Sequence, residues 1–174
     1  MQNLPVAPSA GSARQRGFTA IELMVTLAVL AVLAAIAAPS FTPLIERWRV
    51  REATEDLQST LYYARSEAIK RGGNVTITAA AGGWAGGWTV ASGSDTLQQT
   101  PALSRVAVTQ SGSKTTLYVD RWGMLSDSSG GAPKAMNLLL TPSGKADTDT
   151  SAIRLCIASG GRIVQSKQGA ACPA

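Results

Sequence analysis

The chain begins with a polar stretch that is followed by a long apolar segment. Residues 1–17 contain two cations, Arg14 and Arg16, and no acidic residue, whereas residues 27–38 contain no polar residue. An α-helix over residues 18–38 would be about 31 Å long, close to the roughly 30 Å hydrocarbon thickness of a bilayer. The pattern predicts one membrane-spanning helix. The alternative is a buried core helix of a soluble protein, which would usually carry a polar stripe.

The two cations before this helix predict its orientation. Cationic residues favour the cytoplasmic side, so Arg14 and Arg16 place the N-terminus in the cytoplasm and the residues after the helix outside it. A cleaved secretory signal has a shorter apolar region followed by a small-residue cleavage site. We therefore expect the helix to be retained.

Residues 39–71 are predicted to form a second, amphipathic helix. Pro39 and Pro43 interrupt the apolar run, so a kink is expected near them. Residues 46–71 carry six positive and five negative charges. Gly72 and Gly73 predict the end of the helix. Apolar residues recur at spacings typical of one helical stripe, at Phe41, Leu44, Ile45, Trp48, Leu57, Leu61, Ala64 and Ala68.

From Gly72 onward the composition changes, because 15 of the 17 glycines lie there. Residues 72–174 are predicted to form a β-rich domain, with loops over Ser92–Pro101 and Ser126–Pro133. A helix followed by strands predicts an α+β fold, in which a long N-terminal helix packs on a small antiparallel β domain. The expected strands are Val75–Ala80, Trp88–Ala91, Val106–Thr109, Thr116–Val119, Asn137–Leu140, Ile153–Ala158 and Arg162–Gln165.

Composition argues against an enzyme. The 174 residues include no His, which excludes a Ser-His-Asp or Cys-His nucleophile and makes a zinc site improbable. The Gly-rich segment AAAGGWAGGW lacks the helix and Lys of a phosphate-binding loop. We predict no catalytic site, no metal and no cofactor. Three tryptophans of the β domain, Trp84, Trp88 and Trp122, could form a stacking platform for a ligand. We expect Trp88 in the core and only Trp84 at an exposed loop tip, which does not favour such a platform.

The two cysteines, Cys156 and Cys172, predict one disulfide if the domain lies outside the cytosol. The bond would enclose 15 residues and contribute about 3 kcal/mol. Its expected role is structural, since neither a CxxC spacing nor an activating environment is visible.

The segment RQRGFTAIEL resembles the junction of a type IV prepilin. In that family a polar leader ends in Gly, a Phe follows, and a Glu is the fifth residue of the mature chain; Gly17, Phe18 and Glu22 match these places. Ala20 departs from the commoner Leu. The resemblance implies a type IV pilin fold, cleavage after Gly17 by the prepilin peptidase, N-methylation of Phe18 and assembly into a filament. Pro39 matches the family's helix-breaking proline.

The position of Glu22 in an apolar helix also indicates a role for its carboxylate, independently of the resemblance. A carboxylate inside an apolar helix costs roughly 2–3 kcal/mol and is normally retained for a partner. The amine of Phe18 in a neighbouring subunit would neutralise Glu22 and set the axial register, as the family implies. The alternative is a carboxylate that rests in the head-group zone.

Residues 57–68 narrow the resemblance to the FimT/FimU and secretion pseudopilin H group of minor pilins, which share the pattern L-x-x-x-L-x-x-A-R-S-E-A. The group implies a subunit that primes or caps a type IV pilus or a type II secretion pseudopilus. It also implies other minor pilins and the major pilin as partners, and the bacterial inner membrane as location, with a periplasmic C-terminal domain. Arg65 and Glu67 are expected to contact the sheet or a neighbouring subunit, the alternative being a solvated helix surface.

Two basic regions suggest binding surfaces. Arg47, Trp48, Arg49 and Arg51 are expected to anchor the chain against anionic head groups, with nucleic-acid contact as the alternative. DNA-uptake members of the FimT-like group carry a G-R-x-R element near the C-terminus. Here Gly161 and Arg162 match its first half, and Val164 replaces the second Arg. The alternative function is therefore a DNA-binding minor pilin for natural transformation. It would use the tail cations Arg154, Arg162 and Lys167.

Overall fold

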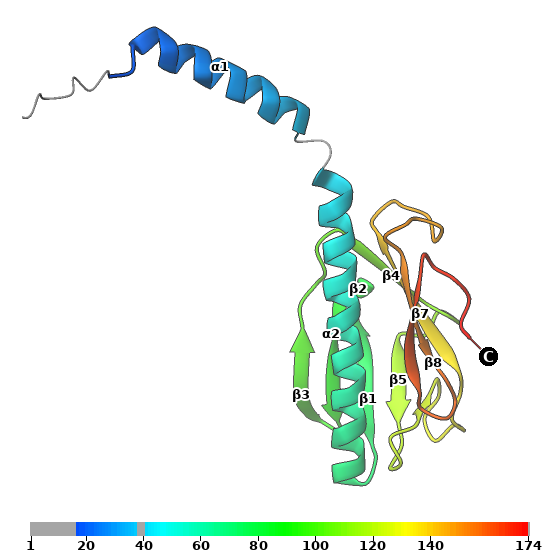
Figure 1. Cartoon of the computed structure of the whole chain (residues 1–174). Coiled ribbons are helices and arrows are strands. Elements are labelled where there is room, and N and C mark those ends of the chain that lie inside the picture. The colour runs from blue at the N-terminus through cyan, green and yellow to red at the C-terminus, as the bar shows by residue number, and fades with distance from the viewer. Residues whose placement is uncertain (1–16, 38–40, 174) are drawn as a thin grey trace, which may run out of the picture. The chain divides into compact units, whose positions relative to one another are not determined.

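The computed structural model describes residues 17–37 and 41–173 (Figure 1). These residues belong to two compact units, of which the first contains α1 (Ala20–Ala37) and the second begins at Phe41. Each unit is described by itself below.

In the first unit, α1 is an 18-residue helix with Glu22 in its first turn. Of the two prolines near which a kink was predicted, Pro39 lies outside the described ranges. Within residues 17–37 and 41–173, no helix combines the length and apolar character that a membrane crossing requires.

The second unit is organised around the 30-residue helix α2 (Thr42–Arg71). Pro43 lies in the first turn, where its missing N–H breaks no intrahelical bond, so it begins this helix and does not interrupt it. At the other end Gly72 adopts a left-handed φ of 78°, and Gly73 donates its backbone N–H to the Ala68 carbonyl at 2.7 Å. The two glycines therefore end the helix as predicted.

Two antiparallel sheets pack against α2 (Figure 1). The five-stranded sheet has the order β3-β2-β1-β5-β6, and the four-stranded sheet has the order β4-β7-β8-β9. The predicted α+β fold is confirmed. The strands are β1 (Val75–Ala80), β2 (Gly83–Ser92), β3 (Asp95–Thr100), β4 (Val106–Gln110), β5 (Thr116–Val119), β6 (Leu125–Ser126), β7 (Met136–Pro142), β8 (Ile153–Ile157) and β9 (Ile163–Lys167).

The core lies between α2 and the two sheets. Leu57, Leu61, Ala64 and Ala68 of the predicted apolar stripe are fully buried there. Trp88 of β2 is also buried, and its indole N–H donates to the Thr60 hydroxyl at 3.0 Å. The indole N–H thus has the partner that burial of a polar group requires.

Most of the stretch predicted as the loop Ser92–Pro101 forms the edge strand β3 instead. Its sequence DTLQQT is largely polar and partly exposed, so it lacks the apolar alternation that announces a strand. Backbone pairing with β2 holds it in place. The strand β6 was missed because a two-residue strand leaves no sequence period to recognise.

The prediction that Trp84 lies at an exposed loop tip is wrong. Trp84 is in β2, is 4% exposed, and donates its indole N–H to the Lys114 carbonyl at 2.8 Å. The flanking glycines reflect tight backbone packing, because a Cβ at Gly87 would lie 2.3 Å from the Thr100 carbonyl oxygen of β3. Gly87 also has a φ of +95°, which other residues rarely adopt.

Candidate functional site

The junction before α1 is built around a reciprocal contact between Thr19 and Glu22. The backbone N–H of Glu22 donates to the Thr19 hydroxyl at 3.3 Å, and the backbone N–H of Thr19 donates to Glu22 Oε2 at 3.4 Å. This is a capping box, which satisfies two N–H groups that a helix start leaves unpaired. The T-x-x-E spacing of Thr19 and Glu22 could have predicted this capping box from the sequence.

The residues of the predicted cleavage junction lie beside this cap. Gly17, Phe18, Thr19 and Glu22 border one shallow hollow. Phe18 is 82% exposed, and a Cβ at Gly17 would meet no atom within 4 Å. The structure therefore brings Gly17, Phe18 and Glu22 together, whereas Pro39 lies outside the described residues.

Large apolar side chains of both helices are exposed. In the second unit, the apolar stripe predicted for α2 is exposed to solvent over its first turns, because the buried positions of α2 begin only at Val50. The exposed apolar residues of α2 before Val50 are Leu44, Ile45 and Trp48, and Phe41 directly precedes the helix. In the first unit, the exposed large apolar residues of α1 are Ile21, Leu23, Met24, Val25, Leu27, Val29, Leu30, Val32, Leu33 and Ile36.

Arg65 joins α2 to turns at the ends of both sheets. Its Nε donates to the Gly123 carbonyl at 2.7 Å, and its Nη1 donates to the Gly161 carbonyl at 2.6 Å. Arg65 was predicted to contact the sheet or a neighbouring subunit, and its partners are the turns that join strands of the two sheets. Gly161, the first residue matched to the G-R-x-R element, thus has a structural partner.

Glu67 has its partners on its own helix instead. Arg71 Nε donates to Glu67 Oε2 at 2.7 Å, and Lys70 lies 3.5 Å from Oε1. The pKa of Glu67 is lowered, and the hydrogen bond from Arg71 is the main cause. The positive charge of Lys70 lowers this pKa further, whereas desolvation of the carboxylate raises it. The expectation that Glu67 contacts the sheet or a neighbour gains no support within the described residues.

The predicted disulfide joins Cys156 of β8 to Cys172, with 5.6 Å between their Cα atoms. The tail between them is also held by Arg154, which donates to the carbonyls of Gly169 and Ala170 at 3.1 Å each. Arg154 further donates to the Asn137 side chain at 2.8 Å. The guanidinium of Arg154 is therefore occupied by structural contacts.

The three tail cations do not form one surface. Arg154 pairs with Ser166 and Lys167 pairs with Ile153 in the β8–β9 ladder, so Arg154 and Lys167 project from opposite faces of the sheet. Arg162 is exposed at the start of β9, on the face that carries the disulfide. Lys167 instead shares the other face with Gln165, which hydrogen-bonds to Gln58 of α2 at 2.6 Å.

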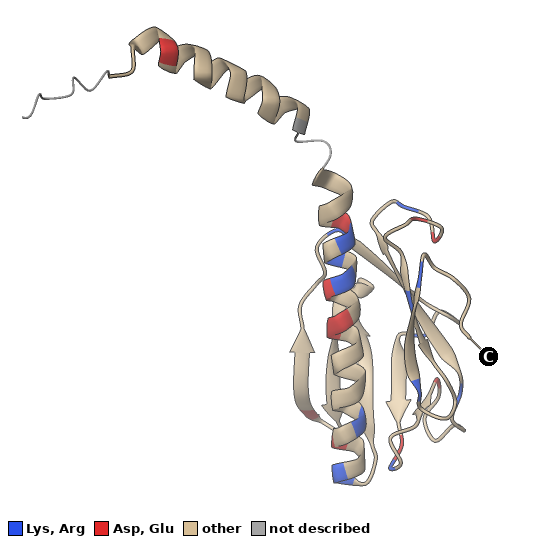
Figure 2. Ribbon diagram, in the orientation of Figure 1, with Lys and Arg blue, Asp and Glu red and all other residues tan. Residues whose placement is uncertain are grey.

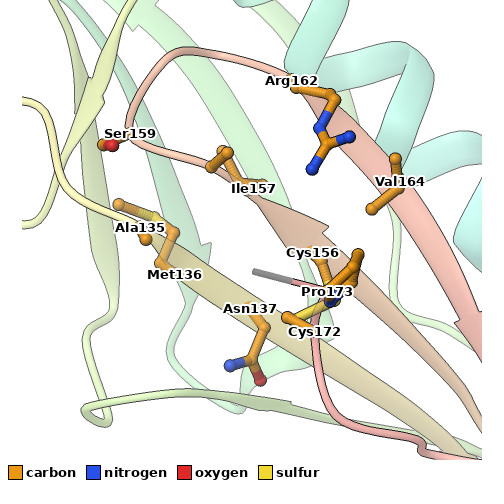
Figure 3. Close-up of a pocket in the computed structure, with 11 residues that line it drawn as sticks. Ala135, Met136, Asn137, Cys156, Ile157, Ser159, Arg162, Val164, Cys172 and Pro173 are labelled. Carbon is orange, nitrogen blue, oxygen red and sulfur yellow. A yellow bond between two sulfur atoms is a disulfide. The ribbon is translucent and has the colours of Figure 1, made fainter.

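Arg162 borders a pocket of about 320 Å³ beside the disulfide (Figure 3). The guanidinium points toward the pocket from one side, and Asn137 and Cys172 lie across from it. The other lining groups are mainly apolar, and none of the described lining residues forms an acid–base pair with Arg162. The pocket can accept an apolar group beside a cation.

The tryptophans of the β domain do not form a stacking platform. Trp84 and Trp88 are buried in the core, whereas Trp122 is 72% exposed. Trp122 follows Asp120 in a tight turn, where the Asp120 carboxylate accepts its backbone N–H at 2.8 Å. Stacking on successive bases needs several exposed aromatic rings, and only one of these three tryptophans is exposed.

The apolar helix with its Gly-Phe junction, together with a helix packed on two antiparallel sheets, defines a type IV pilin-like protein. The prokaryotic N-terminal methylation motif matches residues 12–38, and the model of type II transport protein GspH matches residues 53–169. The second match covers more than half of the chain. The chain therefore belongs to the GspH family, and it is a structural pilin-type protein rather than an enzyme.

Two solved structures share the fold, and both are crystal forms of the type IV minor pilin FimU of Pseudomonas aeruginosa strain PAO1. The P21 form has a TM-score of 0.59 and 24% identity, covering 73% of this chain and 95% of that one. The P65 form has a TM-score of 0.56 and 24% identity, covering 69% and 94%. No curated protein sequence matches the chain. At this identity the likeness concerns the fold.

Proposed function

We propose that the chain is a minor pilin or pseudopilin that primes or caps a type IV pilus or a type II secretion pseudopilus. The observation that carries the proposal is the methylation motif matched over residues 12–38, which includes an apolar helix with exposed side chains. A globular domain with its own core has no folding need for such a helix. Burial against the helices of other pilin subunits gives it one.

The junction supports processing by the prepilin peptidase. Cleavage after Gly17 would free the amine of Phe18, which would then be N-methylated. Glu22 lies one helical turn further along α1, where the amine of a neighbouring subunit would neutralise it and set the axial register. In the uncleaved chain the Thr19 N–H is already within 3.4 Å of this carboxylate.

The proposed location is the bacterial inner membrane before assembly, and the pilus or pseudopilus afterwards. Residues 18–38 would anchor the chain, with Arg14 and Arg16 on the cytoplasmic side. The disulfide between Cys156 and Cys172 supports an oxidising periplasm for the second unit. Other minor pilins and the major pilin would be the partners.

Intact mass of the full chain, co-expressed with a prepilin peptidase, tests the proposal. We expect loss of residues 1–17 and the gain of one methyl group. Gly17→Val should block cleavage without disturbing the fold, because a side chain at Gly17 has open space around it. Gly11→Val in the same leader is the matched control and should be cleaved. An uncleaved wild-type chain would reject the proposal.

DNA binding for natural transformation is the second candidate. It is supported by the exposure of Arg162 and Lys167, and it is weakened by the engagement of Arg154 with the tail. A gel shift over a salt series, with Arg162→Gln beside wild type, tests it. Loss of affinity in this variant would support the candidate, and no affinity at low salt would dismiss it.

A further inference from the structure

A basic groove lies between the first turns of α2 and the end of β9. Its volume is about 660 Å³, and its walls include Arg47, Arg51 and Lys167. These cations come from two regions more than a hundred residues apart. None of the residues lining the groove is acidic. This convergence was not visible in the sequence, where Arg47 and Lys167 belong to two separate basic regions.

Two of the three cations have no carboxylate partner. Among residues 17–37 and 41–173, neither Arg47 nor Lys167 forms a salt bridge. Arg51 donates to Glu55 at 2.9 Å, but both side chains are largely exposed, so this pair is weak. The groove thus holds positive charge that is open to an anion.

The chemistry of the groove fits a phosphate group. Guanidinium groups bind phosphate oxygens through paired N–H donors, and an ammonium adds a point charge. The side chains of Thr150 and Gln165 also line the groove and can donate to further oxygens. We propose that the groove between α2 and β9 binds the phosphate of an anionic phospholipid head group.

The position of the groove in the chain favours a lipid. This step rests on the proposed function, because it takes α1 as the membrane anchor. Arg47 follows the last residue of α1 by ten positions, so the chain between them can span at most about 36 Å. Trp48, beside Arg47, is 63% exposed, and Trp is enriched at membrane interfaces. Anionic leaflets attract such juxtamembrane cations.

A nucleic-acid strand fits this surface less well. Acidic and basic residues are interleaved along the first half of α2 (Figure 2), and the acids there are Glu46, Glu52, Glu55 and Asp56. A long polyanion would run against these carboxylates, whereas one phosphate in the groove would not. A single head group is therefore the better occupant.

Native mass spectrometry of the full chain, in an uncharged detergent with added phosphatidylglycerol or phosphatidylcholine, tests the proposal. We expect retained phosphatidylglycerol, little retained phosphatidylcholine, and about a fivefold loss of the former for each of Arg47→Gln and Lys167→Gln. Arg121→Gln is the matched control, because Arg121 is exposed beside Gly73, beyond the other end of α2. It should retain the lipid as wild type does.

Equal retention of the two lipids, or an equal loss in Arg121→Gln, would overturn the proposal. Displacement of the lipid by a single-stranded oligonucleotide that needs the same cations would overturn it in favour of nucleic acid. Flotation with neutral phosphatidylcholine vesicles tests the membrane anchor separately. Wild type and all variants should float through the apolar helix, and failure to float would reject the anchor whatever the lipid counts show.

Discussion

The guanidinium of Arg65 donates a hydrogen bond of 2.6 Å to the carbonyl of Gly161, 96 residues later in the chain. A second bond of 2.7 Å reaches Gly123, so one side chain of α2 links turns at the ends of both sheets. Arg65→Leu should lower the free energy of unfolding by about 2–4 kcal/mol, because it leaves two carbonyls without their charged donor. Urea denaturation measures this. Arg121→Leu, an exposed control, should change it by less than about 0.5 kcal/mol; equal losses would contradict the role of Arg65.

Gly87 of β2 lies in close backbone contact with the end of β3. Gly87→Ala should destabilise the domain by more than about 1 kcal/mol, since the added Cβ meets the Thr100 carbonyl oxygen and φ is positive. Thermal unfolding measures the loss. Gly82→Ala is the control, because its Cβ would meet nothing closer than 3.7 Å and its φ is not positive. A loss no larger than that of Gly82→Ala would speak against the close approach.

The disulfide closes the C-terminal tail onto β8. Cys156→Ser with Cys172→Ser should cost about 3 kcal/mol, the value expected for a loop of this length in the chain-entropy model. Reduction of the wild type should give the same loss in urea denaturation and leave the double variant unchanged. If reductant also lowered the free energy of unfolding of the double variant, the loss seen in the wild type would not come from the disulfide.

Acid should weaken the ion pair of Glu67. Because the folded pKa of Glu67 is lowered below its usual value near 4.5, its contribution to stability is present above that value. The contribution is lost as pH falls through the lowered folded pKa. The stability difference between wild type and Glu67→Gln should therefore shrink as pH drops below about 4.5. Glu52→Gln, an exposed control without an ion pair among the described residues, should show no such trend.

The sequence predicted those elements whose side chains follow a simple period. β1 and β5 were predicted with their observed bounds, because each alternates toward a buried face. β3 was missed because an edge strand can be polar on both faces. Trp84 was misplaced because neighbouring glycines suggest a loop, whereas here they allow two strands to pack closely.

Contacts between distant residues could not be predicted from any local pattern. The carbonyl partners of Arg65 depend on where two turns meet one helix. The division of Arg154 and Lys167 between opposite faces depends on the register of β8 and β9. The grouping of Lys167 with Arg47 likewise follows from the position of β9 across a groove from α2, which the tail sequence does not indicate.

The amount of chain in sheared filaments, for wild type and Glu22→Gln, tests the central claim of assembly through the N-terminal helix most directly. Gln can still accept the capping hydrogen bond from Thr19, so the variant removes the charge and keeps the helix start. We expect wild type in the filament fraction and at least about a tenfold reduction for Glu22→Gln, since the amine of the neighbouring subunit loses its partner. Equal incorporation of the two chains, or wild type missing from the filaments, would contradict the account.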